Sequence, residues 1–152
     1  MKASLKTLAN TVTNTTAGLD TLPVRLAIGI VFMVHGAQKL FAWFGGYGLE
    51  GTAGWMASIG IEPSLLMATL AGSAEFFGGL ALIVGLLVRP AGLVLAVTML
   101  VAIFTVHFEN GLFMSNNGYE YALALFVASL GLVLRGAGSL SLDAVLQSKL
   151  AK

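Results

Sequence analysis

Long runs of apolar residues, separated by short polar or glycine-containing stretches, dominate the pattern along this chain. They cover Leu22 to Phe44, Ser64 to Leu87, Pro90 to Phe108 and Asn117 to Leu134. A hydrocarbon core about 30 Å thick takes roughly 20 helical residues to cross, so these runs are long enough to span a bilayer. Backbone groups in lipid must be hydrogen-bonded within the protein, and the alternating pattern of barrel strands is absent. The sequence therefore predicts an all-α fold, a bundle of four transmembrane helices.

The loop between the first two runs contains a helical pattern of its own, in the stretch GTAGWMASIGIEP. Trp55, Met56 and Ile59 recur about one turn apart, and Gly60 and Pro63 are helix-stop signals. We predict a short helix in this first outer loop that lies in the membrane interface, anchored by Trp55.

The composition supports a membrane protein and excludes several other classes. Of the 152 residues, 57% are hydrophobic and 10% are charged, whereas soluble domains have about 45–50% apolar and about 25% charged residues. The net charge of +1 provides no basic field for nucleic acid, so the expected partner is the lipid bilayer. The absence of cysteine excludes disulfides, thiolate metal sites and cysteine-ligated iron–sulfur clusters.

Lysine and arginine positions predict the orientation, because short cytoplasmic loops are enriched in these residues. One side of the membrane carries Lys2, Lys6, Arg25, Arg89, Arg135, Lys149 and Lys152. The loops on the other side carry acidic residues but no Lys or Arg, so both termini are expected to be cytoplasmic. We divide the chain into a cytoplasmic tail (1–21) with no long apolar stretch of a cleaved signal peptide, a membrane domain (22–142) and a second cytoplasmic tail (143–152).

Several ionisable or hydrogen-bonding side chains fall within or at the ends of the predicted spans, where they are costly unless they are paired or functional. The candidates are Arg25, His35, Gln38, Lys39, Glu75, His107, Glu120 and Tyr121. On the first helix Arg25 and Lys39 share one stripe, which must therefore face protein. Glu75 has small residues one turn away on both sides, which lets a neighbouring helix approach it closely.

The depth of each residue decides which of these groups can meet. Counted from the outer helix ends at about 1.5 Å per residue, His35 lies roughly 13 Å deep and Glu75 roughly 16 Å deep, so these two are expected to pair. By the same count Lys39 lies about 7 Å deep and Glu120 about 4 Å deep. The flexible Lys39 side chain can therefore reach Glu120 or His107, and either His35 or Lys39 can compensate the charge of Glu75. A polar site is predicted in the outer half of the bundle.

For most of these residues a structural role stays open. Lys39 can extend to the outer headgroups, and Arg25 can anchor the cytoplasmic boundary. The residues at the outer ends can be solvated groups or members of an aromatic belt at the interface; they are Trp43, Trp55, His107, Glu109, Tyr119, Glu120 and Tyr121. Glu75 is the strongest functional candidate, because an acidic residue among apolar neighbours in the middle of a span is hardest to explain by packing.

Metal cofactors are not expected. His35 and His107 differ in depth by roughly 12 Å, which prevents both from ligating one haem iron. A metal site formed by His35, Glu75 and Glu120 can be drawn, but the Glu-x-x-His pair of di-iron bundles is missing. The sequence therefore predicts neither haem, nor an iron–sulfur cluster, nor a bound metal ion.

Three stretches of the sequence carry a resemblance to a known family: LPVRLAIGIVFMVHGAQKLF, LAGSAEFFGGLALIVGLLVRPAGLVLA and YEYALALFVASLGLVLRGAG. Over about residues 22 to 142 the chain resembles the DoxX family of small four-helix membrane proteins, to which the DoxD-type thiosulfate:quinone oxidoreductase subunits are related. The resemblance implies a multi-pass protein of a bacterial-type inner (plasma) membrane that is associated with redox enzymes, often with quinones or sulfur compounds. The features that carry it are Arg25, the HGAQKLF segment with His35 and Lys39, the AEFFGG segment with Glu75, and Glu120 with Tyr121.

Three functions follow from these observations. The first is a quinone- or quinol-binding subunit of a membrane oxidoreductase, which needs a redox partner protein because no electron carrier is visible. Its residues are Glu75 and His35 as catalytic groups, Lys39, Gln38, Glu120, Tyr121 and His107 as ligand-binding groups, and Arg25 as a structural anchor. The second is a membrane module that recruits a soluble redox enzyme through the outer loops or the C-terminal stretch SLSLDAVLQSKLAK, whose Leu140, Val145 and Leu146 indicate a short amphipathic helix. The third, a proton or small-solute transporter, requires a homo-oligomer because four spans are few.

Overall fold

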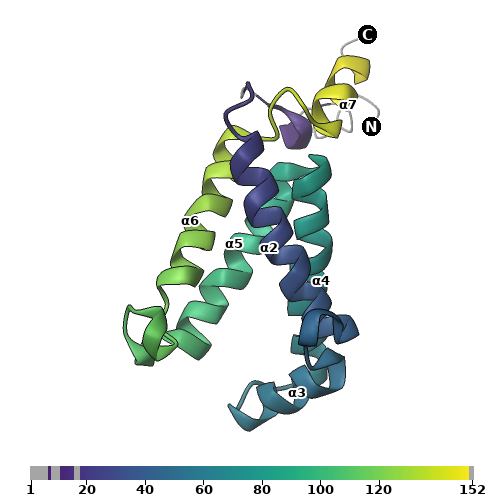
Figure 1. The fold of residues 1–152 in the computed structure, drawn as a ribbon. Coiled ribbons are helices and arrows are strands. Elements are labelled where there is room, and N and C mark those ends of the chain that lie inside the picture. Colours follow the sequence, from purple (N-terminus) through teal and green to yellow (C-terminus); the bar gives the residue numbers. More distant parts are fainter. Residues whose placement is uncertain (1–6, 8–10, 16–17, 151–152) are drawn as a thin grey trace.

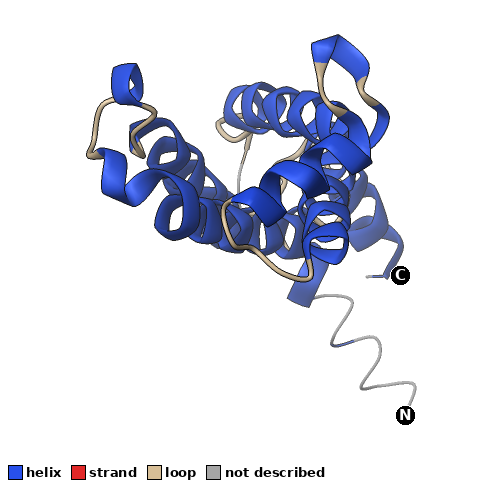
Figure 2. Cartoon of the chain, turned by 90° about the horizontal axis from the view of Figure 1, so that it is seen from below, coloured by secondary structure: helices blue, strands red, loops and turns tan. Residues whose placement is uncertain are grey.

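Helices joined by loops make up the part of the chain that the computed structural model describes, residues 7, 11–15 and 18–150, and this part contains no strand (Figure 2). The helices that position the site are α2 (Leu22–Phe41), α3 (Gly48–Ser58), α4 (Ser64–Val84), α5 (Val88–Ala102), α6 (Glu120–Arg135) and α7 (Leu142–Leu150). Short turns complete the connections: η1 (Trp43–Gly45), the π-helical η2 (Ile103–His107), η3 (Phe108–Asn110) and η4 (Met114–Asn116). Part of the predicted N-terminal tail, 1–21, lies outside the described residues.

Three helical stretches within the described residues are long and apolar enough to cross a membrane: Leu22–Phe41, Ser64–Val84 and Val88–Asn110. They coincide with the first three predicted spans, and the all-helical prediction is confirmed for this part of the chain. α6 has 16 residues, about 24 Å of helix at about 1.5 Å per residue, against a hydrocarbon core of about 30 Å. A membrane crossing by α6 therefore stays a prediction, as does the interfacial placement of α3.

The helices form two pairs that diverge toward one end of the molecule (Figure 1). α2 packs along α4 and α5 packs along α6, whereas α2 and α6 touch at few points. α3 packs on α4 and α2 at the divergent end, where the connection from α5 to α6 also lies. Residues 11–15 and α7 lie together at the opposite, closed end. The arrangement separates a closed end that holds both described ends of the chain from an open end that holds the long loops.

Glycines let α2 and α4 approach each other at backbone contact distance. A Cβ atom on Gly79 would lie 2.6 Å from the carbonyl oxygen of Gly29. A Cβ atom on Gly36 would lie 2.8 Å from the carbonyl oxygen of Gly72 and would clash with the backbone nitrogen of Phe76. Lipid tails provide no hydrophobic drive for helix association, so close packing of this kind is a main source of helix pairing in a membrane. The contact also fixes the rotation of α2, and with it the direction of every polar side chain on that helix.

We expect the substitution Gly36→Ala to weaken the α2–α4 pair and to lower the free energy of unfolding by about 1–3 kcal/mol, because the added methyl group forces the two backbones apart. Thermal unfolding of the purified protein in nanodiscs, followed by circular dichroism, measures the effect. The matched control is Gly54→Ala on α3, where an added Cβ meets no atom within 4 Å. Equal midpoints for the two variants would contradict this account of the pairing.

Two buried charged residues, Arg25 and Asp143, close the end of the bundle opposite the divergence. Their exposed fractions are 2% and 1%. The Arg25 guanidinium donates to the carbonyl oxygens of Ala137 and Leu140, the latter at 2.7 Å. The Asp143 carboxylate accepts two backbone N–H groups at the start of α5. The segment that follows α6 is thereby fastened across the beginnings of α2 and α5.

Candidate functional site

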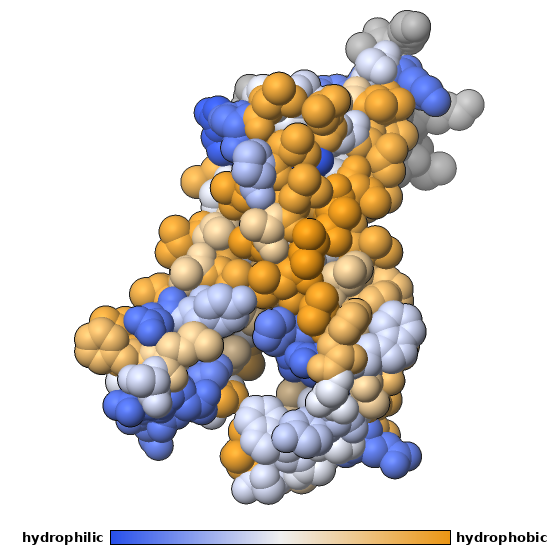
Figure 3. All heavy atoms as spheres, viewed as in Figure 1, coloured by the Kyte–Doolittle hydropathy of each residue, from blue (hydrophilic) through white to orange (hydrophobic). Residues whose placement is uncertain are grey.

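A cleft opens between the two helix pairs at their divergent end. In the space-filling view the molecule is hollowed there, with hydrophilic residues at the inner end of the hollow and on its rims (Figure 3). His35 on α2 and Tyr121 on α6 are both exposed. Their ring centroids lie 6.5 Å apart, so the two side chains face each other from opposite helix pairs. The cleft therefore has polar, ring-bearing side chains on both of its walls.

An ion pair between Lys39 of α2 and Glu75 of α4 lies within the first helix pair. Lys39 Nζ is 2.5 Å from Glu75 Oε2. The Glu75 side chain is 6% exposed and the Lys39 side chain 25% exposed, so the carboxylate is enclosed while the ammonium group stays partly accessible. Hydrogen bonds between ionised partners are shorter and stronger than neutral ones. A single charge at this depth in a membrane is energetically costly, and the pairing of Lys39 with Glu75 reduces that cost for both groups.

The connection that follows α2 folds back and fixes the end of the helix around Lys39. Gln38 Nε2 donates to the carbonyl oxygen of Phe44 at 3.2 Å, and Thr52 Oγ1 of α3 donates to the carbonyl oxygen of Lys39 at 3.5 Å. Ala42 and Phe44 adopt φ values of 58° and 54°. Non-glycine residues rarely hold this conformation, and it persists only where the surroundings determine it. The end of α2 is therefore a constrained platform for the ion pair.

His35 is oriented by its own helix. Its Nδ1 lies 2.9 Å from the carbonyl oxygen of Val31. A carbonyl oxygen only accepts, so Nδ1 carries the proton in this arrangement. Within the described part of the chain no hydrogen bond reaches Nε2. The free nitrogen is an acceptor when the ring is neutral and a donor when it is charged, so His35 can bind a ligand oxygen in either state.

The predicted contacts of Lys39 with Glu120 and His107 are not formed. His107 Nδ1 lies 2.8 Å from the carbonyl oxygen of Asn117. Glu120 Oε1 accepts the backbone N–H of Met114 at 2.6 Å. Both side chains are therefore engaged within the connection between α5 and α6, which they order. The π-helical turn η2 ends at His107, and turns of this kind are frequent near functional sites.

Of the two partners considered for Glu75, His35 and Lys39, the structure shows Lys39, and the expected pairing of His35 with Glu75 is not formed. The rotation of α2 explains the difference. Gly36 lies against the backbone of α4, and His35, one position earlier, is turned by about 100° around the helix axis. His35 therefore faces α6, whereas Lys39, three residues after Gly36, comes back to the side of α4.

Arg25 lies at the closed end of the bundle, away from the cleft, with its guanidinium turned into the protein. Its proximity to Asp143 was not predicted, because Asp143 lies in a segment that reads as a polar tail. The signal in the sequence was the spacing of Leu140, Val145 and Leu146 in this tail, which predicts a short amphipathic helix. Thr52, which supports Lys39 from α3, gave no sequence signal at all.

The side chains at the cleft can bind and protonate a small polar ring. Lys39 offers ammonium donors, Glu75 a carboxylate, His35 a free ring nitrogen and Tyr121 a phenol at the opposite wall. Among the residues that the structure describes, no group of three or more His, Cys, Asp or Glu side chains is arranged to hold a metal ion. The described groups therefore suit hydrogen bonding and proton transfer.

These features define a small helical membrane protein with a buried ion pair beside an open cleft. The chain belongs to the DoxX family, whose profile matches residues 21–108, the part that contains α2 to α5 and both members of the ion pair. The predicted family is thereby confirmed.

Curated relatives match most of the chain. A protein of Bacillus subtilis (strain 168) named "Putative oxidoreductase CatD" is 38% identical over 125 residues, which cover 82% of this chain and 85% of that protein. Two uncharacterized proteins of Haemophilus influenzae are 33% and 28% identical, over 79% and 86% of this chain and 85% of each of those proteins. No solved structure matches the chain.

Proposed function

We propose that this protein is the membrane subunit of a redox system and binds the ring of a quinone or quinol in the cleft at the divergent end. The observation that carries the proposal is the enclosed ion pair of Lys39 and Glu75, 2.5 Å apart, with Lys39 one helical turn along α2 from His35 at that cleft. Ionisable groups at membrane depth are rare and commonly mark a ligand or proton pathway. The word "oxidoreductase" in the name of the Bacillus subtilis relative supports a redox setting.

The chemistry of quinone reduction fits the groups at hand. A quinone takes up two electrons and two protons, and its two carbonyl oxygens become hydroxyl groups. In this proposal the accessible part of the Lys39 ammonium group and His35 Nε2 hydrogen-bond the ring oxygens, and Glu75 exchanges a proton that accompanies electron transfer. No described residue is itself an electron carrier, so a partner protein with a redox cofactor supplies the electrons.

The proposed setting is the inner (plasma) membrane of a bacterium, with four spans and both termini in the cytoplasm. The closed end carries Arg89 and Arg135, and the loops of the divergent end carry Glu50, Glu62 and Glu109 but no Lys or Arg. The cleft then lies in the outer half of the bilayer, with α3 in the outer interface. α6 would cross as the fourth span together with the connection that precedes it.

The test is a titration of a quinol analogue into protein in nanodiscs, read by quenching of Trp43 and Trp55 fluorescence. We expect saturable quenching for the wild type and a dissociation constant at least about tenfold higher for Glu75→Gln, because the variant loses the charge that orients Lys39 toward the ligand. The matched control is Glu109→Gln, which neutralises an exposed carboxylate at the same end of the molecule. No saturable quenching in the wild type would reject the proposal.

The second candidate function is recruitment of a soluble redox enzyme, and α7 is the observation that favours it. Leu142, Val145 and Leu146 are 46%, 49% and 39% exposed on this short helix. Such a module would bind its partner through α7, and partner binding would not depend on the residues of the cleft. Partner binding that survives Glu75→Gln but is lost in Val145→Asp would favour recruitment over ligand binding.

A further inference from the structure

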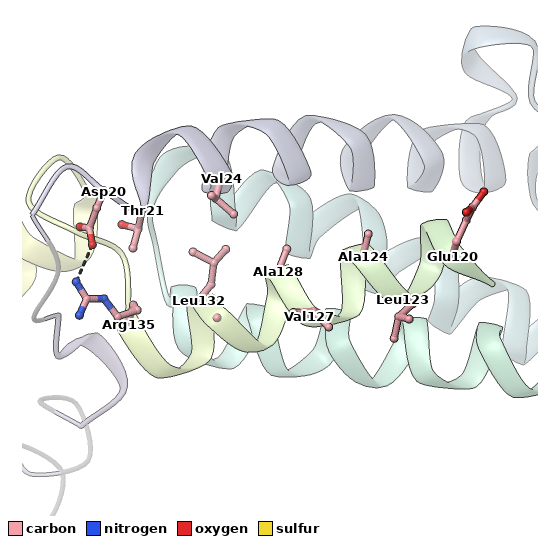
Figure 4. Close-up of a pocket in the computed structure, with 11 residues that line it drawn as sticks. Asp20, Thr21, Val24, Glu120, Leu123, Ala124, Val127, Ala128, Leu132 and Arg135 are labelled. Atoms are coloured by element: carbon pink, nitrogen blue, oxygen red, sulfur yellow. Dashed lines mark hydrogen bonds and ion pairs between the residues drawn. The ribbon is translucent and has the colours of Figure 1, made fainter. Parts of the chain in front are cut away.

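A second cavity, separate from the ion pair, runs along the seam between α2 and α6 (Figure 4). It has a volume of about 690 Å³ and follows α6 from Glu120 to Arg135. One end is closed by the exposed ion pair of Arg135 and Asp20, at 2.6 Å. Glu120 marks the other end and points toward α2. Between these polar ends the lining is almost entirely apolar, with Val24 contributed by α2. We call this cavity the α2–α6 groove.

The groove exists because small residues line α6 where it passes α2. Ala124 and Ala128 point across it, and a Cβ atom added to Gly131 would meet no atom within 4 Å. Small residues of this kind usually let a neighbouring helix come close. α2 does not come close, because its own glycines hold it against α4. The space is therefore left open along nearly the whole length of α6.

The shape, polarity and direction of the groove indicate which chemical class of molecule can bind in it. α6 is about 24 Å long at about 1.5 Å per residue, and a groove along it runs from one side of the hydrocarbon core toward the other. Its apolar lining offers nothing to a polar solute, and a bilayer surrounds it with hydrocarbon chains. A single flexible hydrocarbon chain is thus the chemical class that fits.

The outer end of the groove lies next to the cleft along α6. Glu120, at its outer end, directly precedes Tyr121, and the Tyr121 ring faces His35 with 6.5 Å between centroids. Val24 and His35 lie eleven residues apart on α2, about three helical turns at about 3.6 residues per turn, which places them on the same side of that helix. One molecule can therefore have its ring in the cleft beside the contact of His35 with Tyr121 and its chain in the groove.

We propose that the α2–α6 groove holds the hydrocarbon tail of the ligand whose ring occupies the cleft. The inference rests on the proposed function and specifies its ligand as a tailed, lipid-soluble quinone that enters from the bilayer. A soluble aromatic compound without a tail fills the cleft but leaves the groove empty. The tail fixes the direction of approach, with the ring at the divergent end and the tail running toward Arg135.

The experiment fills the groove and compares two probes. The variant is Ala128→Phe, and the matched control is Leu134→Phe, at a residue of α6 that is 74% exposed and does not line the groove. Both proteins and the wild type are titrated in nanodiscs with a decyl-tailed benzoquinone and with the same ring without a tail, with probe concentrations expressed per lipid. We expect Ala128→Phe to weaken binding of the tailed probe by about tenfold or more, because a ring inserted into an occupied site displaces the chain. Binding of the tailless ring should be unchanged in both variants.

A second measurement shows where the tail lies. A benzoquinone with a photoreactive diazirine at the end of its tail is irradiated in the nanodiscs, and the labelled residues are mapped by mass spectrometry. We expect labels at Val24, Val127 and Gly131 that an excess of the unlabelled tailed probe removes.

Each failure has a distinct meaning. If neither probe binds the wild type, the proposed function itself fails. If both probes bind but Ala128→Phe affects them equally or not at all, the groove is not the tail site while the proposed function stands. If the groove is labelled by a diazirine phospholipid and the tailed quinone does not compete, the groove is an acyl-chain site and the inference is overturned. If Ala128→Phe instead converts a dimer into a monomer, as measured by mass photometry, the groove is filled by a second copy of the chain and the inference is likewise overturned.

Discussion

Replacing Lys39 with methionine should destabilise the protein by about 3–5 kcal/mol, the largest loss that we expect from a single side-chain exchange in the cleft. Glu75 is 4% exposed as a residue and its hydrogen-bonding partner is Lys39, at 2.5 Å. Without the ammonium group the carboxylate is left alone within the first helix pair, where its desolvation is no longer compensated. Unfolding in a titration with sodium dodecyl sulfate, followed by circular dichroism, measures the loss.

Two controls separate an uncompensated charge from simple loss of packing. The double variant with methionine at both Lys39 and Glu75 removes both charges, and we expect it to recover most of the lost stability, because an apolar pair often replaces a buried ion pair without net loss. Asp20→Asn breaks the other ion pair of the described residues, which is exposed on both sides. An exposed pair of this kind contributes little to stability, because water and salt screen both charges. A double variant as unstable as the single one would contradict the explanation.

The double variant also separates stability from function. The double variant could be as stable as the wild type while its tryptophan fluorescence is no longer quenched by a quinol analogue. Such a protein retains its fold and has lost only the binding site. A buried ion pair is weak evidence for stability by itself, since apolar residues can fill the same space. A folded but inactive double variant would therefore assign the pair to ligand binding.

The helical architecture was predictable because its signal is spread over many residues. Runs of apolar residues of the length of a bilayer core located three of the long helices to within a few residues. Glu75 could be chosen as the central site residue for the same kind of reason, since a carboxylate is rare amid apolar residues at that depth. Both predictions depend on the hydrophobicity and position of residues along a single helix, and neither requires knowledge of how the helices pack against each other.

The pairing of the site residues was not predictable, because it depends on rotation about the helix axis. Depth favoured His35 over Lys39 as the partner of Glu75, but the two residues lie only one turn apart on α2, and the long, flexible Lys39 side chain spans that difference. The decision is made by Gly36, whose missing side chain brings α4 against one face of α2. The α2–α6 groove was missed for a related reason: small residues on α6 usually indicate close packing, and here the partner helix is held elsewhere.

Asp143→Ala is the second substitution for which we expect a large effect, a loss of about 2–4 kcal/mol in the free energy of unfolding. The Asp143 carboxylate accepts the backbone N–H groups of Leu87 at 2.7 Å and of Val88 at 3.0 Å. Leu87 is held at a φ of 49° there, and the first N–H groups of a helix have no partners within the helix. Alanine leaves both N–H groups without an acceptor. It also removes the negative charge near the buried Arg25.

The charge of Asp143 matters less than its two acceptor oxygens. Burial raises the pKa of this carboxyl above its usual value, while the N–H groups of Val88 and Leu87 and the positive charge of Arg25 act in the opposite direction. We therefore expect Asp143→Asn, which keeps one acceptor oxygen, to lose only about half as much stability as Asp143→Ala. Limited proteolysis should cut between residues 136 and 150 sooner in the alanine variant, because the segment after α6 is released from α5. Ser148→Ala, at an exposed position of α7, is the control and should be cut at the wild-type rate; an alanine variant at position 143 that is equally resistant would show that Arg25 alone holds the segment.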